Sequence, residues 1–208
     1  MSACFDCPRM CGADRAAGAR GVCSSGELPR AARAAAHYGE EPCISGTRGS
    51  GVIFFTGCSL GYDTVDVKKA TELGIPVVWN SSGYESVESL RRLEGLVQIY
   101  MPDYKYSSSV PAARYSAAPD YPEVASAAIL EMFRQTGPFR LDDEDMLTSG
   151  VLIRHLILPG WTDNSIGCID FVSQSFPQGG VLFSLMSQYT PMPGVGKRFP
   201  ELAGPVED

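Results

Sequence analysis

Short apolar segments alternate with amphipathic segments from residue 51 onward, and this alternation limits the folds that the chain can form. The apolar segments predict strands at 51–55, 75–83, 96–106, 150–160 and 180–194, the first of them buried. The segments between them predict helices at 64–74, 84–95, 121–137 and 162–176. Continuous apolar strands that alternate with helices are typical of a parallel sheet with helical crossovers. A Rossmann-like sheet and a partial (β/α) barrel both fit this pattern.

Polar residues lie at the carboxyl ends of these strands, where parallel α/β folds bind their ligands. Residues 80–83 close the second strand, Asp103 and Lys105 close the third, and Arg154 and His155 lie within the fourth. Asp103 and Lys105 are two positions apart, so both point to one face. A lysine there can hold a ligand carboxylate, and an aspartate can hold an ammonium group or a cation. Arg154 and His155 are adjacent, so only one of them can face a central site.

Four of the seven cysteines crowd the start of the chain at the spacing C-x2-C-x3-C-x11-C. They are Cys4, Cys7, Cys11 and Cys23. Four thiolates this close suit zinc or an iron–sulfur cluster, and buried free thiols are the alternative. Residues 1–50 carry few apolar side chains, so bound metal is a candidate for ordering them. Cys168 lies in a helical pattern among apolar residues, which predicts a core position. Cys58 follows the first strand and fits either a functional site or a small core residue.

Composition excludes several classes of function. The net charge of −7 argues against a general nucleic-acid binder, which carries a basic surface. No segment approaches the roughly 18 consecutive apolar residues of a membrane span, and no basic and apolar signal peptide is evident. We expect a cytoplasmic protein that binds neither nucleic acid nor membrane. Its expected regions are a cysteine-rich metal-binding segment at 1–50, an α/β region at 51–196 and a tail at 197–208.

Seven segments of the chain carry a family resemblance. In order, they are "CFDCPRMCGADRAAGARGVC", "AAHYGEEPCISGTRGSGVIFFTGCSL", "VVWNSSGYESVESLRRLEG", "IYMPDYKYS", "ARYSAAPDYPEVASAAILEMFRQTG", "VLIRHLILPG" and "SLMSQYTPMPG". Together they resemble the radical S-adenosylmethionine (radical SAM) proteins, and within them the branch of the pyruvate formate-lyase activating enzymes. The resemblance extends from Cys4 to Gly194, which is nearly the whole chain.

The resemblance implies a partial (β/α) barrel and a [4Fe–4S] cluster, held by three cysteines in a C-x3-C-x2-C loop after the first strand. In this family the open iron binds the amino and carboxylate groups of S-adenosylmethionine. One electron then cleaves the sulfonium to a 5′-deoxyadenosyl radical, which abstracts hydrogen from a substrate. The implied partners are a glycyl-radical enzyme or other protein substrate, and an electron donor such as flavodoxin or ferredoxin.

The same resemblance assigns roles to the strand-end residues. Residues 80–83 match the loop that contacts the amino end of the cofactor and a cation. Asp103 and Lys105 match a motif that meets its carboxylate, and His155 or Arg154 reaches the pocket from the next strand. The implied cofactor-binding residues are Asn80, Ser81, Ser82, Gly83, Asp103, Lys105 and His155.

The sequence departs from the family at the cluster loop itself. Residues 57–60, "GCSL", match the start of the family phrase, but Tyr62 and Val65 stand where the second and third cysteines belong. The residues after Leu60 resemble a later part of the family, so the chain jumps over a helix and at least one strand. A gene-model artefact, a pseudogene and a functional remodelling would each produce such a junction.

We therefore interpret the chain as an internally deleted, activating-enzyme-like radical SAM protein that is impaired in reductive cleavage. Cys58 is then one cluster ligand without its two companions, and the N-terminal cysteines form a separate zinc or iron–sulfur site. A non-catalytic metal-binding interaction module, built on those N-terminal cysteines, is the alternative. A Rossmann-type nucleotide binder is disfavoured because no glycine-rich phosphate loop follows a strand.

Overall fold

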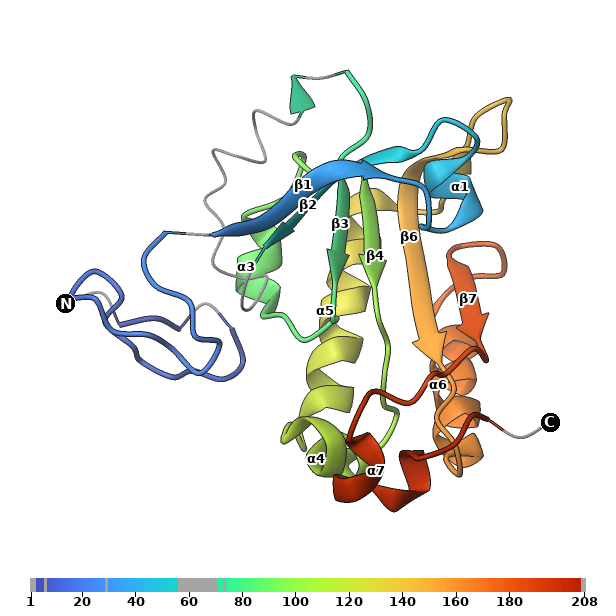
Figure 1. The fold of residues 1–208 in the computed structure, drawn as a ribbon. Coiled ribbons are helices and arrows are strands. Elements are labelled where there is room, and N and C mark those ends of the chain that lie inside the picture. Colours follow the sequence, from blue (N-terminus) through green and yellow to red (C-terminus); the bar gives the residue numbers. More distant parts are fainter. Residues whose placement is uncertain (1–2, 6, 29, 56–70, 73, 207–208) are drawn as a thin grey trace.

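A five-stranded mixed sheet forms the centre of the protein (Figure 1). It is seen in a computed structural model that describes residues 3–5, 7–28, 30–55, 71–72 and 74–206. The strands of this sheet are β3 (Val78–Ser81), β4 (Ile99–Pro102), β5 (Arg140–Leu141), β6 (Leu147–Leu156) and β7 (Leu182–Met186). Most of the predicted helix at 64–74 falls outside the described residues, and so does Cys58.

Four strands of this sheet are parallel. β3 pairs with β4, β4 with β6, and β6 with β7, while the short β5 runs antiparallel to the start of β6. The parallel pairs agree with the alternating pattern of strands and helices in the sequence, and β5 makes the sheet mixed. As a result, the carboxyl ends of β4, β6 and β7 meet at one edge.

The partial (β/α) barrel that the resemblance implied is wrong for this chain. The strand expected to begin it forms β2 (Ser50–Phe55), which pairs antiparallel with β1 (Ala31–His37) in a separate two-stranded sheet. Ile53 and Phe54 are 58% and 42% exposed, so β2 is not the buried strand that its composition predicts either. Without β2, the described part of the main sheet ends at β3 on one side and at β5 and β7 on the other. It therefore stays open.

The strand β1 was not predicted, because its alanine-rich sequence has little strand preference of its own. Its ladder with β2 runs from Ala31 opposite Phe55 to His37 opposite Ser50. The ring of His37 packs edge-on against Phe54, with the centroids 6.1 Å apart. Pairing with an apolar neighbour therefore overrides the local preference of the segment, as is usual for strands.

Helices cover one face of the main sheet. In Figure 1 the two longest helices lie behind the strands, and the β1–β2 pair crosses on the other side. The core on the helical face includes Tyr100, Ile129, Val151 and Cys168, all fully buried. The core position predicted for Cys168 is thus confirmed, and burial raises the pKa of its thiol to about 12. The helices are α3 (Val87–Arg91), α4 (Ser109–Ser116), α5 (Tyr121–Thr136), α6 (Thr162–Ser175), α7 (Val195–Arg198) and a 3-10 turn, η2 (Pro200–Leu202).

The opposite face of the sheet has a smaller apolar cluster and a polar end. Ile99, Met101 and Leu152 pack there against Cys43 and Ile44. Cys43 and Ile44 belong to the one-turn helix α1 (Pro42–Ser45), which follows the turn after β1. On this face, the one-turn helix α1 covers the apolar half of the sheet. Polar side chains lie at the carboxyl ends of the strands. None of the helices in the described ranges is both long and apolar enough to cross a membrane.

The packing of α5 on the sheet is testable with two neighbouring residues. Ile129 is fully buried, whereas Leu130 is 43% exposed. Both lose the same number of carbon atoms on substitution by alanine. We expect Ile129→Ala to lower the free energy of unfolding by about 2–5 kcal/mol because it leaves a cavity. Leu130→Ala should cost about 1 kcal/mol or less. Urea unfolding followed by circular dichroism measures both, and equal losses would contradict this helix orientation.

Candidate functional site

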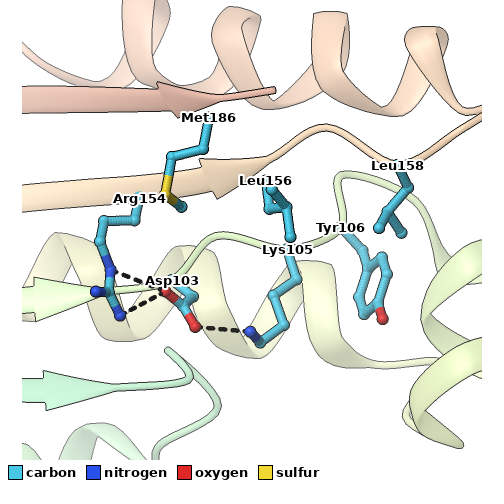
Figure 2. A pocket seen from close by; sticks show the side chains of 7 residues that line it. All are labelled: Asp103, Lys105, Tyr106, Arg154, Leu156, Leu158 and Met186. Atoms are coloured by element: carbon cyan, nitrogen blue, oxygen red, sulfur yellow. Dashed lines mark hydrogen bonds and ion pairs between the residues drawn. The ribbon is translucent and has the colours of Figure 1, made fainter. Parts of the chain in front are cut away.

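A cavity of about 320 Å³ opens at the carboxyl ends of the central strands, on the face that the helices do not cover. This size lies within the range of small-molecule sites. Its lining residues are Asp103, Lys105, Tyr106, Arg154, Leu156, Leu158 and Met186. Figure 2 shows the three charged side chains gathered at one end and the apolar and aromatic side chains around the rest. The cavity can therefore take a ligand with one polar and one apolar part.

Arg154 and Lys105 both bind Asp103. Arg154 Nε lies 3.1 Å and Nη2 3.0 Å from Asp103 Oδ1, and Lys105 Nζ donates to Oδ2 at 2.6 Å (Figure 2). The Arg154 and Asp103 side chains are 18% and 21% exposed, and that of Lys105 is 42% exposed. Lys105 is thus the cation most open to a ligand. Asp103 offers carboxylate oxygens to an ammonium group.

The turn after β1 delivers two carboxylates to the same edge. Glu40 accepts a hydrogen bond from Arg154 Nη1 at 3.3 Å. Glu41 accepts one from Ser184 Oγ on β7 at 2.9 Å. Asn80 on β3 completes the group, because its Oδ1 accepts from Arg154 Nη2 at 2.9 Å. The two sheets are therefore joined by polar contacts centred on Arg154.

Tyr121 holds the backbone behind this site. Its hydroxyl lies 2.8 Å from the carbonyl oxygens of both Ser82 and Asp103, and it accepts from Lys105 N at 3.0 Å. Burial raises the pKa of Tyr121 well above its ordinary value, so the hydroxyl keeps its proton. Gly83 has φ of +73°, and a Cβ there would lie 2.4 Å from Asp103 O. Only glycine fits such an approach.

The structure separates the residues that the resemblance grouped together. Asp103 and Lys105 line the cavity, and Asn80 reaches it through Arg154. Ser81 instead points to the helical side and donates to Glu85 at 2.8 Å, while Ser82 and Gly83 contribute backbone. Of the adjacent pair in β6, Arg154 faces the cavity.

His155 lies on the opposite face of the sheet from that cavity. It is 1% exposed, and its ring nitrogens lie 2.7 Å from Tyr104 O and 2.8 Å from Ser165 Oγ. Burial lowers its pKa, which favours a neutral ring. His155 therefore joins β6 to α6 and does not contact the cavity.

Sequence reasoning did not assign Glu40, Glu41 or Tyr121 to the site. The motif "HYGEEP" places two carboxylates near a histidine, a pattern that does not identify a distant partner for either carboxylate. It could not show that Arg154, more than a hundred positions later, is the partner of Glu40. Tyr121 occurs at the start of a helix, where its pattern is that of a core residue.

The N-terminal cysteines lie in a segment apart from this cavity. Cys4 and Cys7 are each 7% exposed. A Cβ on Gly21 would lie 3.0 Å from Cys11 Sγ and 3.5 Å from Cys23 Sγ, so these two thiols flank one glycine. Backbone hydrogen bonds from Ala13 and Val22 lower the pKa of the Cys11 thiol. In the part of the chain that the structure describes, no three His, Cys, Asp or Glu side chains form a group that could hold a metal ion.

Arg9 attaches the cysteine-rich segment to the main body. Its guanidinium donates to the carbonyl oxygens of Ser116 and Ala117, at the C-terminal end of α4. The group also lies 5.2 Å from the centroid of the Tyr84 ring, and Tyr84 stacks on Tyr121 at 5.8 Å. A cation at a helix C-terminus interacts favourably with the helix dipole.

Comparison with known proteins gives one informative similarity. The chain is 32% identical over 118 residues to an uncharacterized protein, MJ0674, from Methanocaldococcus jannaschii. The matched region is 56% of this chain and 30% of that protein, so the chain spans less than a third of the length of this relative. No protein-family model matches the chain, and no solved structure does.

The buried carboxyl group of Glu85 predicts a pH dependence of stability. Trp79 Nε1 and Ser81 Oγ each donate to it at 2.8 Å, but burial dominates and raises its pKa. The folded state therefore holds this proton more tightly than the unfolded state. The contribution of Glu85 to the free energy of unfolding is largest below its unfolded pKa of about 4.3 and falls as the pH rises through the folded pKa.

Glu85→Gln removes this titration. We expect its free energy of unfolding, relative to that of the wild type, to rise as the pH increases from about 4.3, the unfolded pKa, through the raised folded pKa. Urea unfolding at several pH values measures the difference. Glu88→Gln makes the same change on an exposed residue in the first turn of α3 and provides the control. A constant difference for Glu85→Gln would contradict the raised pKa.

Proposed function

We propose that the chain is an activating-enzyme-like radical SAM protein that binds S-adenosylmethionine in the cavity between β4, β6 and β7. The observation that carries the proposal is the arrangement of Asp103 and Lys105 beside an apolar wall. An aspartate suits the ammonium of a methionyl group, and a lysine suits its carboxylate. Leu156, Leu158 and Tyr106 offer an apolar and aromatic surface of the kind that receives a nucleoside.

The residues present do not fit a [4Fe–4S] cluster of the family type. Such a cluster takes three thiolates from one loop, and this loop offers Cys58 with Tyr62 and Val65 at the other two positions. Residues 56–70 lie outside the described part of the chain. We therefore derive no radical step for this chain. A glycyl-radical enzyme and a flavodoxin or ferredoxin remain proposed partners for a chain that carries the full cysteine set. We propose a cytoplasmic location.

Binding of S-adenosylmethionine tests this function. Isothermal titration calorimetry should show binding by the wild type and a loss of roughly 10- to 100-fold in Asp103→Asn, because hydrogen bonds to charged groups contribute about 1.5–3 kcal/mol. Asp143→Asn makes the same change of charge on an exposed residue of the β5–β6 turn, and it should bind like the wild type. Equal affinities for all three proteins would exclude this cavity as the site.

Reductive cleavage is expected to be absent. The wild-type chain, after anaerobic iron–sulfur reconstitution and reduction with dithionite, should form no 5′-deoxyadenosine from S-adenosylmethionine. The physical reason is that Tyr62 and Val65 stand at the two positions where the family has its other thiolate ligands. Formation of 5′-deoxyadenosine would show that other residues complete the cluster site.

A metal-binding interaction module is the second candidate function. The observation in its favour is that Cys11 and Cys23 flank Gly21 within a segment that also buries Cys4 and Cys7. A structural zinc or iron–sulfur site would order this region, which contributes little apolar core. The described thiols form no group of three that could hold a metal ion. Metal binding would therefore require the side chains of Cys4, Cys7, Cys11 and Cys23 to move closer together.

Metal analysis separates the two metal types and tests the module. The wild type and Cys43→Ser should retain bound metal after gel filtration, whereas Cys11→Ser should lose it. Elemental analysis identifies zinc or iron, and acid-labile sulfide identifies a cluster. Cys43 is the control because it packs beneath the main sheet, away from the N-terminal cysteines. Retention of metal by Cys11→Ser would contradict a site at these residues.

A further inference from the structure

Arg154 uses all three nitrogens of its guanidinium group in contacts within the protein. Its Nε and Nη2 bind Asp103, Nη2 also donates to Asn80, and Nη1 donates to Glu40. Four of its five N–H groups thus point to protein acceptors, so a ligand carboxylate could gain at most one N–H of Nη1 without displacing one of them. Lys105, at 42% exposed, is the easier partner.

Glu40 balances the charge at this end of the cavity. The cavity wall contains one anion, Asp103, and two cations, Lys105 and Arg154. These three groups carry a net charge of +1, which the carboxylate of Glu40 offsets by binding Arg154 directly. The neighbouring carboxylate of Glu41 binds Ser184 instead. The Glu40 side chain is only 13% exposed, so solvent screens its field less than that of a surface charge.

The fold fixes Glu40 in this position. Pro42 begins α1 directly after the turn, and Cys43 and Ile44 pack on the apolar half of the sheet. Glu41 is tied to Ser184 on β7. Besides Arg154, the groups that face Glu40 are Asn80, whose Nδ2 lies 3.5 Å from Oε1, and His37, whose Nε2 lies 3.6 Å from Oε1.

We propose that Glu40 determines the charge preference of the cavity without touching the ligand. Glu40 cancels the excess positive charge of the cavity. A zwitterionic ligand with one additional cationic centre therefore binds more tightly than a zwitterion that lacks this centre. This inference rests on the proposed binding of a methionyl ligand. Within that class, the sulfonium S-adenosylmethionine is then preferred over the uncharged thioether S-adenosylhomocysteine. Glu40 is therefore a specificity-determining residue, and Arg154 transmits its effect.

The test compares two substitutions on one turn. Dissociation constants for S-adenosylmethionine and S-adenosylhomocysteine are measured by calorimetry for the wild type, Glu40→Gln and Glu41→Gln. Glu40→Gln should reduce the ratio of affinities by roughly threefold to tenfold, the effect of one partly screened charge at this range. Glu41→Gln removes the same charge one residue away, but Glu41 binds Ser184 and not Arg154. It should change the ratio less than about twofold.

The outcomes separate the two proposals. If the wild type binds neither compound, the proposed function is wrong and this inference falls with it. If the wild type binds but both variants change the ratio equally, Glu40 has no special role and the inference alone is overturned. Glu40→Asp, which keeps the charge, should keep the preference.

A second measurement does not depend on any variant. In the wild type the preference should weaken as NaCl rises from about 50 mM to about 500 mM, because salt screens the field of Glu40. If Glu40→Gln does not fold, this salt titration alone tests whether the preference is electrostatic. A preference that is insensitive to salt would overturn an electrostatic role.

Discussion

Four segments that are far apart in the sequence meet at the guanidinium group of Arg154. The group projects from β6 and binds the end of β4 through Asp103, β3 through Asn80, and the turn before α1 through Glu40. A guanidinium is planar and its N–H directions are fixed, so its acceptors must keep fixed relative positions. The register of three parallel strands and the placement of the β1–β2 pair are therefore linked. Loss of one acceptor would leave a largely buried charge partly unbalanced.

The sequence predicted most elements of the main sheet and its helices, because each has a strong apolar period and clear end signals. α5, for example, begins beside Pro122 and ends at Gly137, which has φ of +68°. It missed β1, and it predicted the strand at 51–55 but wrongly as a buried strand of the main sheet, because β1 and β2 pair with each other. Asp103 and Lys105 were predicted at the site because their spacing puts both on one face. Glu40 and Tyr121 could not be, since their partners lie 114 and 39 positions away.

The resemblance and the fold lead to different views of the same chain. The strand ends carry a polar group at one end of a cavity with apolar walls, while the strand to which the resemblance assigned the cluster loop pairs outside the main sheet. A binding site can persist in this arrangement because Asp103, Lys105 and Arg154 all come from the parallel strands. The cysteine-rich segment is connected to that site through Arg9 and the stacked rings of Tyr84 and Tyr121. Order in one region is thus physically linked to order in the other.

The contact between Trp79 and Glu85 has a practical consequence. The indole of Trp79 lies in β3, next to Asn80, and is bonded to a buried carboxyl group at 2.8 Å. The second of the two tryptophans, Trp161, is bonded to Tyr115 near the C-terminal region. With Trp161 replaced by phenylalanine, the tryptophan fluorescence of the chain would come from a single indole on the helical face of β3. The protein thus carries its own optical reporter of the buried contact between β3 and Glu85.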